Sequence, residues 1–313
     1  MTNPRALILA LDYGGTKHAA AILAAGEHEW LAHQRVYSPP GADGDYDRAT
    51  MVKMARELLA CAEGKLAAIG VSFGGPVDAT TGTVRLSHHV PGWEDTPLRH
   101  QLQAEFGVPA SVDNDANVAA LGEWRFGAGQ DSASLLYVTV STGIGGGWVL
   151  AGKIYGGADG MAGEIGHIVV RPGGAECVCG KLGCLEVEAC GTAIARKMRE
   201  RLVAVGQPLH AAEPITGESV SRAAQQGDPL AQKVMDDAAC LLGLGLGGAI
   251  NLMNPQRIVL GGGVTKSGER WWRSVRETAR AQALPQMRVD IVPAMLGDDA
   301  PLWGAITLGE AWL

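Results

Sequence analysis

Few aromatic residues, few charged residues and no long unbroken apolar segment are found in this 313-residue sequence. Aromatic residues make up 5%, charged residues 19% and hydrophobic residues 47%, a balance typical of a globular rather than a disordered chain. The basic residues form no block and the formal net charge is −7, which argues against a nucleic-acid partner. The apolar stretch at residues 240–253 is interrupted by glycines and falls short of a membrane span. Since no cleavable leader pattern is seen at its start, we expect a soluble cytoplasmic protein.

Cysteine is also scarce, but half of the six cysteines are clustered. Cys177, Cys179 and Cys184 lie within eight residues, whereas the other three are isolated. A disulfide framework would spread pairs along the chain, so the cluster indicates a metal site. The glycines of Cys-x-Cys-Gly-x-x-Gly-Cys let three thiolates converge on one tetrahedral ion, and His167 is the candidate fourth ligand of a structural zinc site. The alternative is a set of free buried thiols.

Glu164 and His167 lie three residues apart in the segment that precedes the cysteines. If this segment is helical, both side chains are on the same side. A metal on one ring nitrogen of His167 fixes the tautomer, so the other nitrogen is free to donate to a substrate oxygen. Zinc is therefore expected to brace a substrate-binding wall without taking part in the reaction.

Glycine, in contrast, is abundant, and its 44 residues gather behind apolar runs. Apolar runs that are typical of buried strands end in a glycine turn at residues 7–11, 69–71, 135–140 and 258–260. The first and third of these units share one plan, a strand, a glycine-rich turn and a second strand, which indicates a duplicated domain. The alternative is chance recurrence of glycine-rich hairpins.

Helical patterns fill the intervals between the predicted strands. Helices are expected at residues 47–63, 97–106, 115–124, 186–205, 219–252 and 303–313. Strands that alternate with helices predict an α/β protein with mixed sheets flanked by helices, in which ligands bind where strand ends meet. We expect a first domain at residues 1–127, to which the helix at 303–313 returns, and a second domain at residues 128–302 that contains the zinc motif.

Two glycine turns have the composition of phosphate-binding loops. The first contains Asp12, Gly14, Gly15, Thr16 and Lys17, and its glycines, hydroxyl and amine suit a bound phosphate. Asp12 needs a cation beside a phosphate, which implies Mg²⁺. The second loop contains Thr142, Gly143 and Gly145, and a third glycine turn comprises Gly261, Gly262 and Gly263. Neither loop has P-loop spacing, and ordinary tight turns are the alternative.

A polar cluster, Asp113-Asn114-Asp115-Ala116-Asn117, stands between a predicted strand and a predicted helix. Asp115 is the candidate general base, because phosphoryl transfer needs a carboxylate that takes the proton of a sugar hydroxyl. Asn114 offers both a donor and an acceptor, which suits a neighbouring hydroxyl. The alternative is that Asp115 only caps the helix.

With these motifs the sequence resembles the ROK family of sugar kinases and repressors, within the sugar kinase/actin/Hsp70 superfamily. The resemblance runs from about residue 6 to residue 312 and includes the turn at 74–76, Pro-Gly-Trp at 91–93, TGIGGG at 142–147 and GEIGH at 163–167. It implies two ribonuclease-H-like domains with the active site in a cleft between them. It also implies ATP, Mg²⁺ and a structural Zn²⁺, and a homodimer or homotetramer.

The resemblance assigns roles to individual residues as well. It implies Asp115 as catalytic base, and zinc on His167, Cys177, Cys179 and Cys184. The residues that it places on the sugar are Gly75, His89, Asn114, Asp115, Glu164, His167 and Glu186. Repressors of the family carry a helix-turn-helix domain before the first glycine loop, and only about ten residues precede Asp12 here, so a repressor is not expected.

His89 departs from the family pattern and leaves the sugar open. Similar kinases have Asn in the segment Asn-Leu-Pro-Gly-Trp, and His89 stands in that place here. An imidazole is bulkier than an amide and has one donor when neutral. We expect a hexose kinase that uses ATP to phosphorylate O6 of glucose, with mannose, fructose, N-acetylmannosamine or N-acetylglucosamine as alternatives. The second hypothesis is a sugar-binding regulator without turnover.

Overall fold

The computed structural model describes residues 5–87, 89–207 and 214–313. The chain forms two units, each with its own set of strands and helices. Unit 1 comprises Met1–Asp131, Gly147–Ala162 and Asp298–Leu313, and unit 2 comprises Ser132–Gly146 and Gly163–Gly297.

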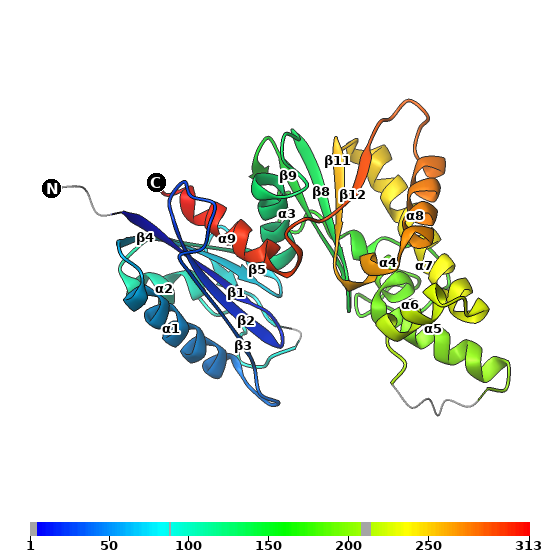
Figure 1. The fold of residues 1–313 in the computed structure, drawn as a ribbon, viewed down its shortest axis with the longest axis horizontal. Helices are drawn as coiled ribbons and strands as arrows, with labels where there is room; N and C mark the ends of the chain where they lie inside the picture. The colour runs from blue at the N-terminus through cyan, green and yellow to red at the C-terminus, as the bar shows by residue number, and fades with distance from the viewer. Residues whose placement is uncertain (1–4, 88, 208–213) are drawn as a thin grey trace. The chain divides into compact units, whose positions relative to one another are not determined.

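The sheet of unit 1 has the strand order β3-β2-β1-β4-β7 (Figure 1). Its strands are β1 (Ala6–Tyr13), β2 (Lys17–Ala24), β3 (Ala32–Tyr37), β4 (Lys65–Phe73) and β7 (Ala110–Asn114). The first three pair antiparallel, whereas β1, β4 and β7 run parallel. The carboxyl ends of these three parallel strands therefore meet at one edge of the sheet, where the first glycine loop and the polar cluster follow.

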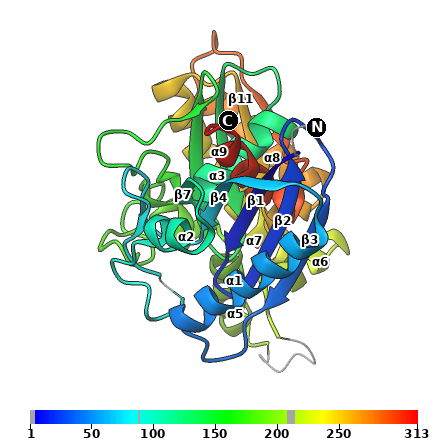
Figure 2. The ribbon, with the colours of Figure 1, turned by 90° about the vertical axis from the view of Figure 1, so that its left-hand side faces the viewer.

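Side chains alternate between the two faces of this sheet, and helices cover both faces (Figures 1 and 2). Leu7, Leu9 and Leu11 belong to a core with α1 (Gly44–Cys61) and α2 (Leu98–Phe106). The alternate residues Ile8 and Ala10 belong to a second core with α3 (Asp115–Phe126) and α9 (Ala300–Glu310). The last helix of the chain is thus part of the core of unit 1. A short separate sheet joins β5 (Val77–Asp78) and β6 (Thr83–Val84).

The second sheet has the order β10-β9-β8-β11-β12 and repeats the plan of the first. Its strands are β8 (Ser134–Val140), β9 (Ile144–Leu150), β10 (Lys153–Ile154), β11 (Arg257–Gly261) and β12 (Asp290–Pro293). β11 runs parallel to both β8 and β12, while β10 is antiparallel to β9. A hairpin side and a parallel side occur in both sheets, in agreement with the duplication that the two glycine-rich hairpins predicted.

The helices of unit 2 are α4 (Leu185–Ala189), α5 (Gly191–Ala204), α6 (Gly217–Gln225), α7 (Pro229–Met253) and α8 (Glu269–Gln282). Among the described residues, α7 is the one helix with the length and apolar composition of a membrane span. Its apolar window is 61% buried inside the structure, and Gly243 lets it approach α8 closely. We therefore describe α7 as the core helix of unit 2.

Two of the expected helices were wrong in their extent, because each is split in two. The helix expected at 186–205 breaks at Cys190, whose backbone is extended and which caps α5. The helix expected at 219–252 breaks before Pro229, because proline is favoured in the first turn and disfavoured in a helix interior. Asp228 caps the new helix by accepting the N–H groups of Leu230 and Ala231, both at 2.8 Å.

Candidate functional site

The first glycine loop is the turn between β1 and β2. Gly14 N–H donates to the carbonyl of Lys17 at 3.0 Å, and a Cβ on Gly14 would lie 2.7 Å from that oxygen, so the turn requires glycine. Lys17 Nζ lies 3.3 Å from Asp298 Oδ2, which holds its charge beside the loop. The imidazole of His89 covers Gly15, since a Cβ on Gly15 would lie 3.1 Å from His89 Cδ2. An amine and an imidazole therefore lie beside the half-buried glycines of this loop.

Polar residues lie in register at the carboxyl edge of the unit 1 sheet, with Asp12 beside Ser72 and Ser72 beside Asp113. Ser72 Oγ donates to Asp12 Oδ1 at 2.7 Å. Burial raises the pKa of Asp12 to about 6, the negative charge of Asp115 adds to this, and the Ser72 hydrogen bond opposes it. Burial also raises the pKa of Asp113. Carboxylates grouped in this way have the chemistry to hold a cation.

The N-terminus of α3 carries the candidate base. Asn114 is the N-cap, because its Oδ1 accepts the N–H of Ala116 at 3.0 Å, while its Nδ2 donates to the carbonyl of Gly75 at 3.0 Å. The alternative role of Asp115 as the N-cap was wrong, since Asp115 is the first residue of the helix. A Cβ on Gly74 would lie 3.7 Å from Asp115 Oδ2. Because the N–H of Gly74 donates to the end of β1, this places Asp115 next to the first glycine loop.

The second glycine loop is the turn between β8 and β9 in unit 2. The N–H of Ile144 donates to Glu186 Oε2 at 2.9 Å. A Cβ on Gly143 would lie 2.5 Å from the same oxygen, so glycine is needed for this contact. At the third turn, Gly262 has a φ of 87° and a Cβ there would overlap the carbonyl of Val140, at the end of β8.

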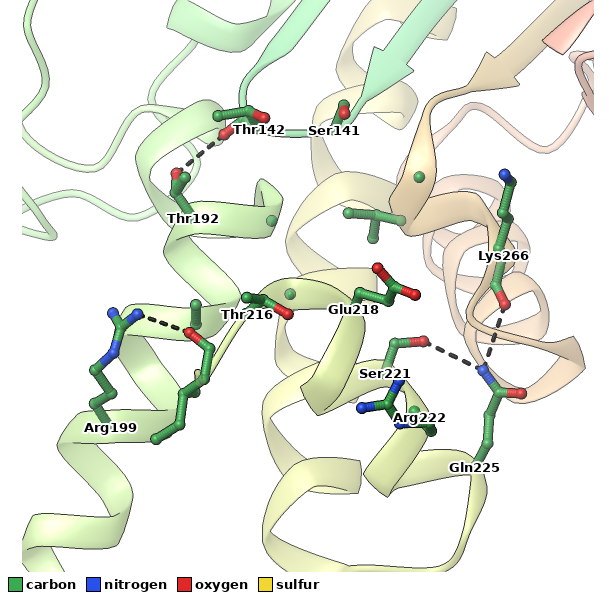
Figure 3. Close-up of a pocket in the computed structure, with 16 residues that line it drawn as sticks. Ser141, Thr142, Thr192, Arg199, Thr216, Glu218, Ser221, Arg222, Gln225 and Lys266 are labelled. Atoms are coloured by element: carbon green, nitrogen blue, oxygen red, sulfur yellow. Dashed lines mark hydrogen bonds between the residues drawn. The ribbon is translucent and has the colours of Figure 1, made fainter. Parts of the chain in front are cut away.

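A cavity of about 720 Å³ adjoins the second and third turns within unit 2 (Figure 3). Its lining residues include Ser141, Thr142, Thr192, Arg199, Thr216, Glu218, Ser221, Arg222, Gln225, Gly263 and Lys266. Thr192 Oγ1 donates to the carbonyl of Thr142 at 3.0 Å, which fixes the second loop to the start of α5. Gln225 Nε2 lies 3.2 Å from Ser221 Oγ.

No motif in the sequence marks the side chains that α6 contributes to this cavity. Glu218, Ser221, Arg222 and Gln225 follow one another at the three- and four-residue spacing of one helix face. That polar face, on a segment that begins with a Thr cap at residue 216, is the signal from which they could have been found.

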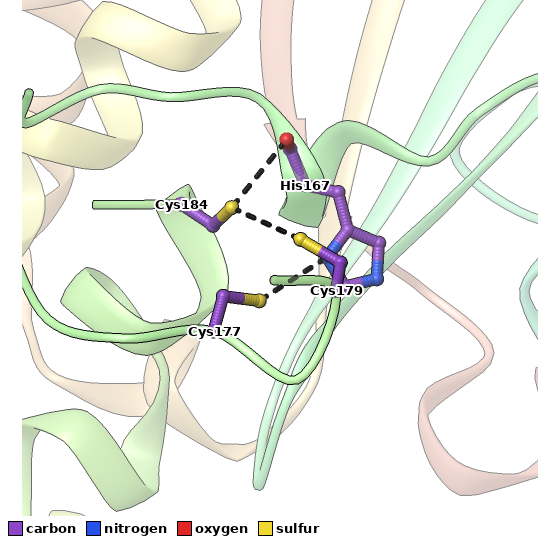
Figure 4. Close-up of side chains that lie close together, drawn as sticks. All are labelled: His167, Cys177, Cys179 and Cys184. Atoms are coloured by element: carbon purple, nitrogen blue, oxygen red, sulfur yellow. Dashed lines mark hydrogen bonds between the residues drawn. The ribbon is translucent and has the colours of Figure 1, made fainter. Parts of the chain in front are cut away.

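The four predicted metal ligands converge (Figure 4), with all four ligand atoms within 4.8 Å of one another. His167 Nδ1 lies 3.5 Å from Cys177 Sγ, and Cys179 Sγ lies 3.6 Å from Cys184 Sγ. The N–H of Lys181 lowers the pKa of Cys179 to about 7. Burial and the neighbouring thiols raise the pKa of Cys184 to about 12. Three thiols and one imidazole at this spacing fit a tetrahedral Zn²⁺, whose charge would allow all three sulfurs to ionise.

Beside the cysteine cluster, the side chains of Glu164 and His167 lie close together. His167 lies in the 3₁₀ turn η1 (Ile165–His167), and its Nε2 is 3.8 Å from Glu164 Oε2. Nδ1 of His167 thus faces the cysteines, whereas Nε2 faces the Glu164 carboxylate. Cys184 directly precedes α4, the helix that carries Glu186, so the same cluster supports all three side chains.

The predicted site residues divide between the two units. Unit 1 contains Asp12, Gly14, Gly15, Thr16, Lys17, Gly75, His89, Asn114 and Asp115. Unit 2 contains Thr142, Gly143, Gly145, Glu164, His167, Cys177, Cys179, Cys184, Glu186, Gly261, Gly262 and Gly263. Within unit 1 the first loop, His89 and Asp115 lie together, and within unit 2 the second loop, Glu186 and the cysteine cluster lie together.

Comparison with known proteins identifies the family. The ROK family profile matches residues 8–311. The chain belongs to the ROK family. A glucokinase of Halalkalibacterium halodurans is 40% identical over 257 residues, which cover 78% of this chain and 76% of that protein. An N-acetylglucosamine repressor of Escherichia coli is 35% identical over 227 residues, 72% of this chain and 56% of the repressor.

A solved structure of the family has the same fold. It is a ROK glucokinase from Streptomyces griseus in complex with glucose and AMPPNP, 33% identical, with a TM-score of 0.78 over 97% of this chain and 99% of that chain. The expected fold class is therefore confirmed, an actin-like α/β protein of ribonuclease-H-like domains with mixed sheets flanked by helices.

Proposed function

We propose that this ROK protein is an ATP-dependent hexose kinase in which Asp115 is the general base. The observation that carries the proposal is the position of Asp115, at the start of α3 and next to the first glycine loop through Gly74. A carboxylate beside a phosphate-binding turn can orient a sugar hydroxyl and take its proton while the phosphoryl group is transferred. The similarity to glucokinases supports the same reaction class.

Unit 2 contains a cavity that suits ATP. The cavity of about 720 Å³ is within the usual size range of small-molecule sites and adjoins Thr142 and Gly263 of the second and third turns. We assign the adenosine part of ATP to this cavity and its phosphates to the glycine turns. Asp12 would hold Mg²⁺, which supplies the charge that neutralises the transferred phosphoryl group.

Each unit contributes side chains that suit sugar hydroxyls. In unit 1, Asn114 uses its Oδ1 and one N–H in hydrogen bonds to the described residues, and we assign its second N–H to a sugar hydroxyl. In unit 2, Glu164, His167 and Glu186 supply carboxylates and a ring nitrogen on the zinc-supported wall. Zn²⁺ on the cysteine cluster would hold this wall in place. We also propose a homodimer or homotetramer, which light scattering would measure.

The decisive experiment is a coupled assay with ATP and Mg²⁺ over a panel of hexoses, with the wild type and Asp115→Asn. We expect turnover with glucose above the other sugars. Asp115→Asn should retain sugar binding and lose about 10²-fold or more in kcat, the usual contribution of a general base. The exposed Asp290→Asn is the matched control and should turn over normally. A near-normal kcat in Asp115→Asn would exclude the base role.

His89 is the residue that we expect to select the sugar. Its imidazole lies on Gly15 of the first loop, where an amide would leave more room. We therefore propose that simple hexoses are preferred to N-acetyl sugars, and that His89→Asn reduces this preference. The measurement is the kcat/KM ratio of glucose to N-acetylglucosamine and to N-acetylmannosamine. An unchanged ratio in the variant would remove His89 from the sugar site.

A sugar-binding regulator is the second candidate, because the chain is also similar to a sugar repressor. The same panel separates the two functions. Sugar binding measured by calorimetry without turnover on any sugar would favour the regulator, whereas turnover would favour the kinase.

A further inference from the structure

Glu186 connects the substrate wall of unit 2 with the second glycine loop. Its Oε2 accepts the backbone N–H of Ile144 at 2.9 Å. Within the described residues, Oε1 makes no hydrogen bond and the side chain is half-buried, so this oxygen is open to a ligand. One carboxylate can thus bond the loop with one oxygen and a sugar hydroxyl with the other.

Two glycines allow the neighbouring backbone to approach Glu186 closely. A Cβ on Gly166 would overlap the carbonyl of Ile144 and would lie 3.4 Å from Glu186 Cβ. A Cβ on Gly143 would lie 2.5 Å from Glu186 Oε2. The turn that carries Glu164 and His167, the second loop and α4 are therefore in direct contact, and a shift of Glu186 is transmitted to the loop.

The physical consequence is a link between two binding events. A hydroxyl bound to Oε1 restricts the rotation of the carboxylate, and this in turn fixes the N–H of Ile144 that Oε2 holds. A nucleotide that then binds to the loop has less conformational freedom to remove, so it binds more tightly. The linkage is reciprocal, because the nucleotide strengthens sugar binding by the same factor.

We infer that Glu186 is a positioning residue that couples occupancy of the sugar site to the geometry of the second phosphate loop. The inference rests on the proposed kinase function. A residue that only binds sugar would change sugar affinity alone, and a residue that only supports the fold would change stability alone. The coupling between the two ligands is the property that separates the three roles.

The experiment measures the Kd of Mg·AMPPNP by calorimetry, without sugar and with saturating glucose, or with whichever sugar the panel assay selects. In the wild type, glucose should tighten AMPPNP by about fivefold or more, the lower range of usual coupling. In Glu186→Ala this ratio should fall to about one. Glu164→Ala is the matched control, because the Glu164 carboxylate lies beside His167 and makes no hydrogen bond to the loop within the described part of the chain, and it should keep the wild-type ratio.

Gly143→Ala tests the same link while keeping the Glu186 side chain. The added methyl displaces a flexible carboxylate rather than backbone, so the fold should be retained. The carboxylate is retained but loses the N–H of Ile144, so the coupling ratio should fall to about one even where sugar still binds. A wild-type ratio near one, or a retained ratio in Glu186→Ala and Gly143→Ala, would overturn the inference. Absence of phosphoryl transfer in the wild type would contradict the proposed function instead, whatever the ratio.

Discussion

Asp12 is a carboxylate that the proposed reaction needs, but its buried position leaves its negative charge poorly solvated. The side chain is 7% exposed, and burial raises its pKa to about 6 against the opposing hydrogen bond from Ser72. Lys17 and His18 also favour the charged form, but less than burial disfavours it. In the absence of a cation this residue therefore lowers the stability of the folded chain at neutral pH.

Replacing Asp12 with Asn should stabilise the protein in a pH-dependent manner. The pKa of Asp12 rises from 3.8 in the unfolded chain to about 6 in the folded chain. The buried charge therefore does not destabilise the folded chain below pH 3.8, and its full destabilising effect is present above about pH 6. We expect Asp12→Asn to raise the free energy of unfolding at about pH 8 by about 2–3 kcal/mol and to have little effect at about pH 4. Urea unfolding without nucleotide and Mg²⁺ measures this.

Activity provides the second part of this test. Asp12→Asn should lose turnover although it is more stable, because the amide cannot hold Mg²⁺ as a carboxylate does. An equal change in stability at both pH values would contradict the assignment, since it would arise from packing rather than from charge.

The sequence alone located those sites whose residues lie close to one another along the chain. The cysteine cluster and the glycine turns are of this kind, because their residues are neighbours in the sequence. Asp47 is different, since it accepts from the ring of His18 at 2.7 Å and from Trp93 Nε1 at 3.2 Å, both within the buried core. These partners are 29 and 46 residues away from it, and nothing in the local sequence indicates such contacts.

At the scale of elements, ion pairs attach the segment that contains the three clustered cysteines to the helices of unit 2. Arg171 lies 3.1 Å from Glu188 and 2.6 Å from Asp237, and Lys197 lies 2.8 Å and 3.0 Å from the same two carboxylates. Glu188 also accepts the N–H of Ala175 at 2.8 Å. The segment is thus held from one side by ion pairs, and we propose that zinc holds it from the other.

Cys179→Ser should therefore release the metal without unfolding unit 2. The purified wild type should contain about one zinc per chain, and the variant should contain little. The sugar KM should rise by about tenfold or more, because the wall that carries Glu164 and His167 loses its support. Metal analysis and steady-state kinetics measure both effects. Cys240→Ser, an exposed cysteine of α7, is the control and should keep its zinc. Full activity in a zinc-free native preparation would exclude this role.

Helix positions were predictable from apolar periodicity, but some boundaries were not. The helix expected at 97–106 is present as α2 and ends at Gly107, whose φ of 68° stops a helix. The break at Cys190 has no comparable signal, because a cysteine cap resembles an ordinary apolar residue in the pattern. α1 starts at Gly44, three residues before the expected start, because Asp43 caps it there.

At the scale of the whole molecule, the last helix of the chain belongs to unit 1, together with the first part of the sequence. α9 packs on α3 and on the unit 1 sheet through glycines that allow backbones to touch. A Cβ on Gly304 would overlap the carbonyl of Val118 in α3, and one on Gly70 would overlap the carbonyl of Ala305. Apolar periodicity predicts the helix, whereas this crossing depends on contacts between residues far apart in the sequence.

Gly304→Ala should destabilise unit 1 by about 1–3 kcal/mol, because a rigid backbone carbonyl cannot move away as a side chain could. Tryptophan fluorescence reports on this unit, since Trp30, Trp93, Trp124, Trp148, Trp303 and Trp312 belong to it and Trp271 and Trp272 to unit 2. The fluorescence midpoint in urea should therefore fall. Release of the zinc that we propose for unit 2 follows the unfolding of that unit, and its midpoint should not change because unit 2 has a separate sheet.

Gly248→Ala is the matched control for this crossing, because it makes the same substitution in α7 with no atom within 4 Å of the added methyl. Alanine is the better helix former, so Gly248→Ala should leave unit 1 unchanged and stabilise unit 2 by up to about 1 kcal/mol. A similar loss of stability in both variants would mean that glycine is favoured in these helices for another reason. An unchanged fluorescence midpoint in Gly304→Ala would show that α9 and α3 can separate without cost.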